Sequence, residues 1–142
     1  MMASVLTSLI IVLLGGVEEG GGPEGEWVLV AQEYEGNPSS PEQIMARGVE
    51  ISLLNGRFLT TRRLDKTRWH GSYQWDASIT PNEFDFTIDE GPYAGKTQLS
   101  IYKVDGDTLT LCSAEIGKPR PKGFVTRAGD RQYLQTYKRK KP

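Results

Sequence analysis

The sequence predicts an antiparallel β-barrel of about eight strands with one short helix after the first strand. Three observations lead to this fold class. Apolar residues alternate with polar ones through most of the chain, as expected for strands with one buried face. Turn-forming dipeptides such as Asn55-Gly56 separate the short segments. A helical period fits only one brief stretch, so the pattern favours an all-β barrel or sandwich.

The first strand and the helix have recognisable boundaries. Trp27, Leu29 and Ala31 alternate along the first strand and share one of its faces. Ser40 or Ser39, followed by a proline and then by glutamate and glutamine, predicts the start of a helix. Gly48 ends this helix, which is therefore brief.

The first hairpin is predicted from Asn55-Gly56, the strongest short hairpin signal. A two-residue loop places Leu53 opposite Phe58 and keeps the apolar face continuous near the turn. The other register would leave Phe58 exposed, so we prefer the first. Its expected pairs are Leu53 with Phe58, Ile51 with Thr60, and Val49 with Arg62.

Two aromatic-rich strands follow, joined by a loop at residues 76–82. Each strand gathers its large side chains on one face at a period of two. The faces expected are Trp69, Gly71, Tyr73 and Trp75 on the first strand, and Phe84, Phe86 and Ile88 on the second.

The second hairpin is predicted to contain a three-residue loop at residues 104–106, with Gly106 in a β-bulge. This loop pairs Ile101 with Leu109 and Leu99 with Leu111, and so gathers one apolar face. A two-residue turn at positions 105 and 106 would scatter these leucines. Because a slip of one residue inverts every side chain, we expect the core to select the bulged turn.

The rest of the chain is predicted to form an irregular loop and a final strand. Two prolines and two glycines at residues 117–123 predict the loop. A short strand at residues 124–126, a turn at residues 128–130 and a last strand at residues 132–138 follow.

Composition excludes several classes of partner. Seventeen Lys and Arg against eighteen Asp and Glu give a formal net charge of -1, so we expect no nucleic-acid partner. The basic cluster at residues 138–141 is interpreted as a solvated strand end. Cys112 is the only cysteine and His70 the only histidine, which excludes an internal disulfide and a thiolate-pair zinc site. We expect no metal site and no cofactor.

An apolar run at residues 5–14 precedes a Gly-rich stretch. The run is too short to cross a hydrocarbon core of roughly 30 Å as a helix and has the length of a signal-peptide apolar region. We interpret residues 1–22 as a signal-like leader and linker and residues 23–142 as the barrel domain. The expected location is the periplasm, the cell envelope or the exterior, without a membrane span after cleavage. An amino-terminal strand or a start at Met2 is the alternative.

One series of segments runs through most of the chain in a fixed order. Its members are Gly25-Glu26-Trp27, Glu33, Gly71-Ser72-Tyr73, Phe84-Asp85-Phe86, Gly91-Pro92, Gly95-Lys96, Ile101-Tyr102, Gly106-Asp107-Thr108-Leu109, Cys112, Gly117-Lys118-Pro119-Arg120-Pro121 and Phe124. This series resembles a known family of small, mostly exported, lipocalin-like domains of unknown function, abundant in planctomycete bacteria. The likeness covers roughly residues 25–139 and departs from the family at residues 76–81. It implies a lipocalin-like barrel and supplies no catalytic residues.

The Gly25-x-Trp27 segment is also similar to the opening signature of lipocalins proper. There the tryptophan closes one end of the barrel beneath an arginine from the last strand. The resemblance implies that Trp27 is a structural barrel plug, with Arg131 or Arg139 as its cover.

A barrel of this size can be filled by its own side chains or can hold one small ligand. The first hypothesis is therefore the binding of a small apolar molecule, and the alternative is a filled barrel acting as a structural or protein-interaction domain of the cell envelope. We expect a monomer and no enzymatic activity, since no phosphate-binding loop or nucleophile elbow occurs. Lys118 and Arg120 form a second candidate surface, on a loop that matches the family at more positions than a simple connection requires. The expected ligand contacts inside the barrel are Phe58, Tyr73, Trp75, Phe86, Ile101 and Leu111.

Overall fold

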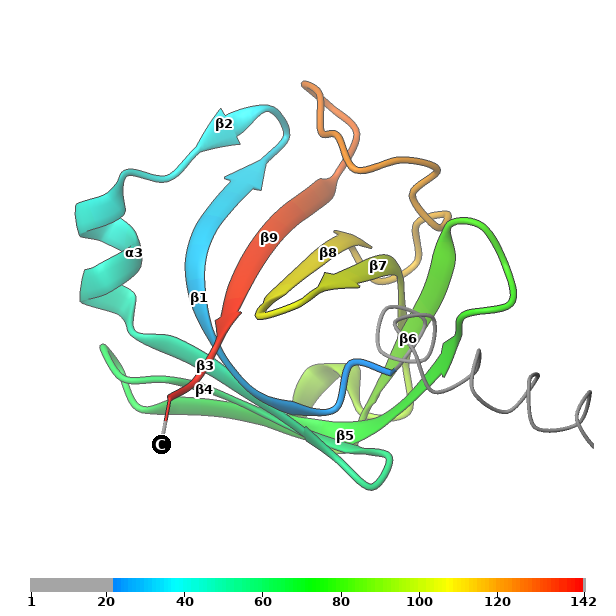
Figure 1. Cartoon of the computed structure of the whole chain (residues 1–142), viewed down its shortest axis with the longest axis horizontal. Coiled ribbons are helices and arrows are strands. Elements are labelled where there is room, and N and C mark those ends of the chain that lie inside the picture. Colours follow the sequence, from blue (N-terminus) through cyan, green and yellow to red (C-terminus); the bar gives the residue numbers. More distant parts are fainter. Residues whose placement is uncertain (1–21, 142) are drawn as a thin grey trace, which may run out of the picture.

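The computed structural model describes residues 22–141, which form one antiparallel sheet closed into a barrel (Figure 1). Strands pair in the order β2-β1-β3-β4-β5-β6-β7-β8-β9, and β1 also pairs with β9, so that eight strands form the ring and β2 is a short extension. The predicted fold class is confirmed and is consistent with a lipocalin-like barrel. The elements are β1 (Gly25–Tyr34), β2 (Asn37–Pro38), α3 (Pro41–Arg47), β3 (Val49–Leu54), β4 (Arg57–Arg62), β5 (Thr67–Asp76), β6 (Asn82–Ile88), η1 (Gly91–Tyr93), β7 (Thr97–Asp105), β8 (Thr108–Ala114) and β9 (Gln132–Arg139).

The residues just before β1 pack against the barrel. Pro23 is fully buried. The leader expected at residues 5–14 lies outside the described residues. No helix within residues 22–141 is long and apolar enough to cross a bilayer.

Helix α3 begins and ends where the sequence predicts. Ser40 Oγ accepts a hydrogen bond from Gln43 N at 3.1 Å, and Gln43 Oε1 accepts one from Ser40 N at 2.8 Å, which completes a capping box. Gly48 ends the helix in the left-handed conformation, with φ 61°. The one buried residue of the helix, Ile44, joins the core of the barrel.

The first hairpin has the predicted register. Asn55 and Gly56 have φ values of 52° and 77°, as a type I′ turn requires. Leu53 pairs with Phe58, and both are buried. The other expected pairs, Ile51 with Thr60 and Val49 with Arg62, are also present.

The predicted register of the second hairpin is wrong. The turn has two residues, Gly106 and Asp107, and Gly106 has the positive φ of 60° that suits the first central position of a type II′ turn. Leu111 pairs with Tyr102, and Ile101 pairs with Cys112. Leu111 and Tyr102 therefore face the barrel core, while Ile101, predicted to face inward, lies on the outer face.

The outer face of this hairpin is buried as well. Ile101 is 1% exposed and Cys112 is fully buried, although neither belongs to the barrel core. The segment of residues 115–131, which we call the strap, packs on this outer face: Val125 O lies 4.0 Å from Cys112 Sγ, and Pro121 is buried. The strap contains no strand, so the short strand predicted at residues 124–126 is wrong.

A β-bulge in β1 corrects another expected face. The pairing of β1 with β9 shifts register between Leu29 and Ala31. Trp27 and Leu29 are buried as predicted, but Ala31 is exposed because the extra residue at Val30 interrupts the alternation.

Close packing of β5 against β6 generates a prediction about Gly71. A Cβ atom on Gly71 would lie 1.9 Å from Thr87 O and 2.9 Å from the Phe58 ring. Gly71→Ala is expected to lower the free energy of unfolding by about 1 to 3 kcal/mol, because backbone atoms must move. Gly123→Ala is the matched control, since a Cβ there has no atom within 4 Å. Urea unfolding curves that coincide for wild type and Gly71→Ala would contradict the packing described.

Candidate functional site

The inner face of the barrel carries a continuous chain of aromatic rings. Phe86 contacts Phe58 at a centroid distance of 5.0 Å and Phe84 at 4.5 Å. Phe84 stacks on Tyr73 at 5.2 Å and meets Tyr102 edge-on at 5.7 Å. These contacts join the neighbouring strands β4, β5, β6 and β7, so this side of the interior is well packed.

Most of the ligand contacts predicted from the sequence lie together in this interior. The barrel core includes Phe58, Tyr73, Phe86 and Leu111. Trp75 lies at the rim, 38% exposed, with its ring edge-on to Tyr102 at 6.4 Å. Ile101 is excluded from the interior by the register of its hairpin.

Tyr102 was missed by sequence reasoning because the bulged hairpin register pointed it outward. The Gly106-Asp107 dipeptide was the available signal, since glycine at the first central position favours a two-residue type II′ turn. With that turn, Tyr102 pairs with Leu111 and enters the core.

Two tyrosine hydroxyls are the most unusual polar groups of the interior. Tyr73 is 5% exposed and Tyr102 is 1% exposed, and within the described residues neither Oη has a hydrogen-bond partner. Burial raises the pKa of Tyr102 to about 12, and the carboxylates of Glu24 and Asp76 add to the effect. Burial also raises the pKa of Tyr73, while the nearby backbone of Gly56 opposes this rise and Glu24 adds a smaller one. Both phenols are neutral at physiological pH and keep a proton to donate.

A short segment of chain, residues 22–24, contacts the barrel beside these tyrosines. Trp27 Nε1 donates a hydrogen bond to Pro23 O at 2.9 Å. Gly22 lies against Trp75, because a Cβ on Gly22 would be 2.5 Å from the indole ring. The negative charge of Glu24 contributes to the raised pKa of both buried phenols. These residues therefore cover the interior near Trp75.

The expected cation over Trp27 is present. Arg139 places its guanidinium carbon 4.2 Å from the centroid of the fully buried Trp27 ring, and its Nη1 donates to Glu24 O at 3.3 Å. The other candidate, Arg131, instead forms an ion pair with Glu115 at 2.6 Å. Trp27 and Arg139 thus hold residues 22–24 against the last strand.

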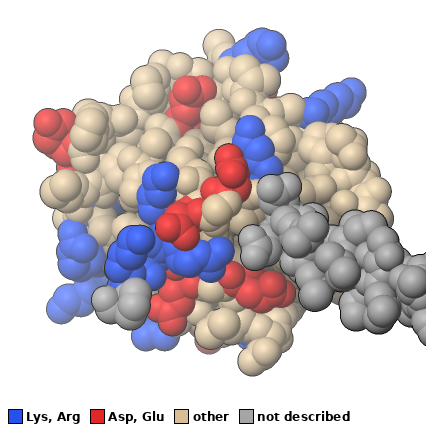
Figure 2. Space-filling view, viewed as in Figure 1, with Lys and Arg blue, Asp and Glu red and all other residues tan. Residues whose placement is uncertain are grey.

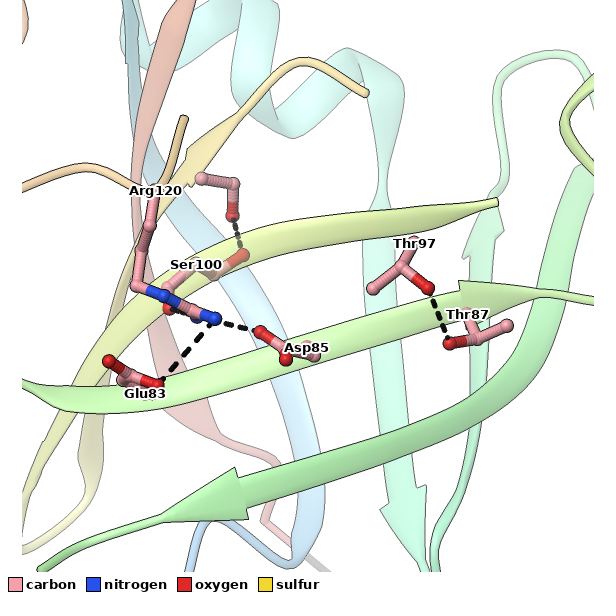
Figure 3. Close-up of polar contacts among 7 residues, drawn as sticks. Glu83, Asp85, Thr87, Thr97, Ser100 and Arg120 are labelled. Atoms are coloured by element: carbon pink, nitrogen blue, oxygen red, sulfur yellow. Dashed lines mark hydrogen bonds and ion pairs between the residues drawn. The ribbon is translucent and has the colours of Figure 1, made fainter. Parts of the chain in front are cut away.

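The structure separates the two residues of the candidate loop surface. Arg120 Nη1 donates to Asp85 Oδ1 at 2.6 Å and to Ser100 O at 2.8 Å, and Nη2 lies 3.6 Å from Glu83 Oε1. Figure 3 shows Arg120 reaching from the strap onto β6. Arg120 therefore fastens the strap to the barrel, whereas Lys118 is exposed.

Other reactive groups do not assemble into a site. Burial raises the pKa of the Cys112 thiol to about 11, so the nucleophilic thiolate is scarce near neutral pH. His70 is on the surface, with Nε2 2.8 Å from Glu90 Oε1. Within residues 22–141, no cluster of three or more His, Cys, Asp or Glu residues is arranged to hold a metal ion.

Comparison with protein-family models and with curated proteins found no match to this chain. The resemblance to the lipocalin-like family of unknown function therefore stays a prediction.

The fastening of the strap can be measured through the reactivity of Cys112. Arg120→Ala removes the charge-assisted hydrogen bonds to Asp85 and Ser100. We expect Cys112 to react about tenfold faster with an aromatic disulfide reagent at fixed pH. Loss of these part-buried contacts should lower the free energy of opening the strap by about 1.4 kcal/mol, which corresponds to a tenfold larger open population. Lys118→Ala is the control from the same segment and should leave the rate unchanged. Equal rates in both variants would show that Arg120 does not hold the strap.

Proposed function

We propose that the protein is an exported lipocalin-like barrel that binds a small, largely apolar molecule carrying a polar group. The observation that carries the proposal is the pair of buried hydroxyls of Tyr73 and Tyr102, which have no partner within the described residues. Leaving a buried polar group unpaired costs about 1 to 3 kcal/mol. A ligand oxygen or nitrogen that accepts from these phenols would remove this cost.

The aromatic surroundings favour an apolar ligand body. The ring of Phe84 contacts both tyrosine rings, and the ring of Trp75 meets that of Tyr102 edge-on. Ligand pockets commonly combine such surfaces with few polar groups that fix orientation. Trp75, which is 38% exposed and lies edge-on to Tyr102 at 6.4 Å, is the rim residue that would have to move for a ligand to reach Tyr102.

A second candidate function is that of a filled barrel acting as a structural or protein-interaction domain of the cell envelope. The contact chain from Phe58 through Phe86 and Phe84 to Tyr102 favours it, because rings in contact leave little free volume. Binding of a ligand would require the packed interior to open. A structural or protein-interaction role requires no change in the interior.

Native mass spectrometry of the protein purified from its own host tests the first proposal. We expect a bound small molecule in wild type and its loss in Tyr73→Phe/Tyr102→Phe. The double variant should also unfold at equal or higher urea concentration, because it removes two unpaired hydroxyls. Tyr137→Phe is the control, since Tyr137 Oη has a partner in Gln135 Oε1 at 3.2 Å and its loss should destabilise by about 1 kcal/mol. A bare mass in repeated wild-type preparations would favour the filled barrel.

Export is tested by the amino terminus of the mature protein. Pro23 is buried and accepts a hydrogen bond from Trp27, so cleavage must occur before Pro23 to preserve the packed barrel end. We expect protein outside the cytoplasm with its first residue at or before position 23. Cell fractionation and amino-terminal sequencing would measure both, and an intact Met1 in a soluble cytosolic pool would contradict export.

A further inference from the structure

A basic hollow lies on the outside of the barrel, away from the interior discussed above. It has a volume of about 330 Å³ and is formed by the end of α3, β3, and the β4–β5 hairpin. We call its four cationic residues the basic rim: Arg62, Arg63, Lys66 and Arg68. The remaining lining residues are Gly48, Glu50, Thr61 and Thr67.

Most of the positive charge of the basic rim is not neutralised. Arg62 forms a two-pronged ion pair with Asp65, at 3.0 and 2.8 Å. Arg63, Lys66 and Arg68 have no ion-pair partner among the described residues. The three unpaired cations therefore dominate the local field.

The positive surface continues beyond the first hollow. Glu50, the one acidic residue of its lining, pairs with Lys140 at 2.9 Å. Lys140 also lines a second hollow, together with Glu26, Arg139 and Lys141. Figure 2 shows Lys and Arg side chains gathered at the lower left, over the β4–β5 turn and the carboxy-terminal end of the chain, with some acidic side chains among them. This concentration contrasts with a formal net charge of -1 for the whole chain.

Exposed apolar side chains flank the basic rim. Met45 on α3 is 74% exposed and Leu64 in the β4–β5 turn is 65% exposed. The two segments are held together, because Arg63 Nη2 donates to Met45 O at 2.8 Å and Leu64 N donates to Arg47 O at 3.1 Å. Trp69, 40% exposed, lies beneath the guanidinium of Arg62 at 5.3 Å. Cations and exposed apolar groups thus occur on one rigid part of the surface.

We propose that the basic rim, with Met45 and Leu64, is a docking surface for an anionic lipid bilayer. Basic residues near a membrane are attracted to anionic headgroups, and apolar tips gain by entering the interface. A soluble polyanion would use the cations but gains nothing from Met45 and Leu64, so the apolar tips select the lipid surface. The docking surface is on the outside of the barrel and does not depend on a ligand inside it.

Co-sedimentation of the full chain with vesicles tests the proposal. The vesicles contain phosphatidylglycerol and phosphatidylcholine in equal parts, and pure phosphatidylcholine vesicles measure any binding by the apolar run at residues 5–14. We expect tighter binding to the anionic vesicles, and loss of the difference near 1 M salt, where charges are screened beyond roughly 3 Å. Equal binding to both kinds of vesicle at low salt would overturn the proposal.

Charge-reversal variants test whether the basic rim is the part of the protein that binds the vesicles. Arg63→Glu/Lys66→Glu/Arg68→Glu should weaken binding to anionic vesicles by at least about tenfold, because each basic residue contributes to the attraction. The matched control reverses three exposed lysines elsewhere, Lys96→Glu/Lys118→Glu/Lys122→Glu, and has the same net charge. The control should weaken binding far less. An equal loss in both triple variants would show that net charge, not this surface, causes the binding.

The apolar tips distinguish a bilayer from a soluble polyanion. Met45→Ala/Leu64→Ala keeps every charge and should weaken vesicle binding by at least about threefold, since less apolar surface enters the interface. In a Trp75→Phe background the emission comes from Trp69 and the fully buried Trp27, and it should shift to shorter wavelength on binding because Trp69 approaches the lipid interface. If binding is insensitive to the apolar double variant and the emission does not move, the surface binds anions in solution and the membrane proposal is wrong.

Discussion

The pairing of β1 with β9 converts this sheet into a barrel, and every buried group inside depends on it. The two strands are joined from Trp27 opposite Arg139 to Tyr34 opposite Tyr133. A closed ring leaves no long unpaired edge, which an open sheet of this length would expose. Arg139 adds a cation over the Trp27 ring, so the last strand also secures the segment that leads into the first.

Closure gives the barrel one core inside, and the strap creates a smaller buried layer outside. The inner face packs aromatic rings around Phe84, while the outer face of β7 and β8 buries Ile101 and Cys112. Arg120 holds the strap through Asp85 and Ser100 O, so an irregular segment stays ordered without ladder hydrogen bonds of its own. The presence of Arg120 in this loop thus has a structural reason.

Two groups of residues have features that the stability of the fold does not explain. Inside, the hydroxyls of Tyr73 and Tyr102 are buried without partners, where phenylalanine would pack at lower cost. Outside, the basic rim concentrates unpaired cations beside the exposed side chains of Met45 and Leu64. The basic rim shares no residue with the aromatic interior, so a ligand in the interior and a membrane on the surface would not compete for the same residues.

The sequence by itself determined the elements whose signals are local. Ser40 and Gly48 delimit α3, and Asn55-Gly56 sets the first hairpin, because caps and turns depend on nearby backbone geometry. It also identified most of the inward aromatic residues, since one face of β5 and β6 is polar. The alternation of the sequence left open which face of β7 and β8 is inside and whether Tyr102 belongs to the candidate site, and the tertiary structure decided both. Both faces of that hairpin are buried, one by the barrel and one by the strap, so alternation alone cannot tell which face is inside.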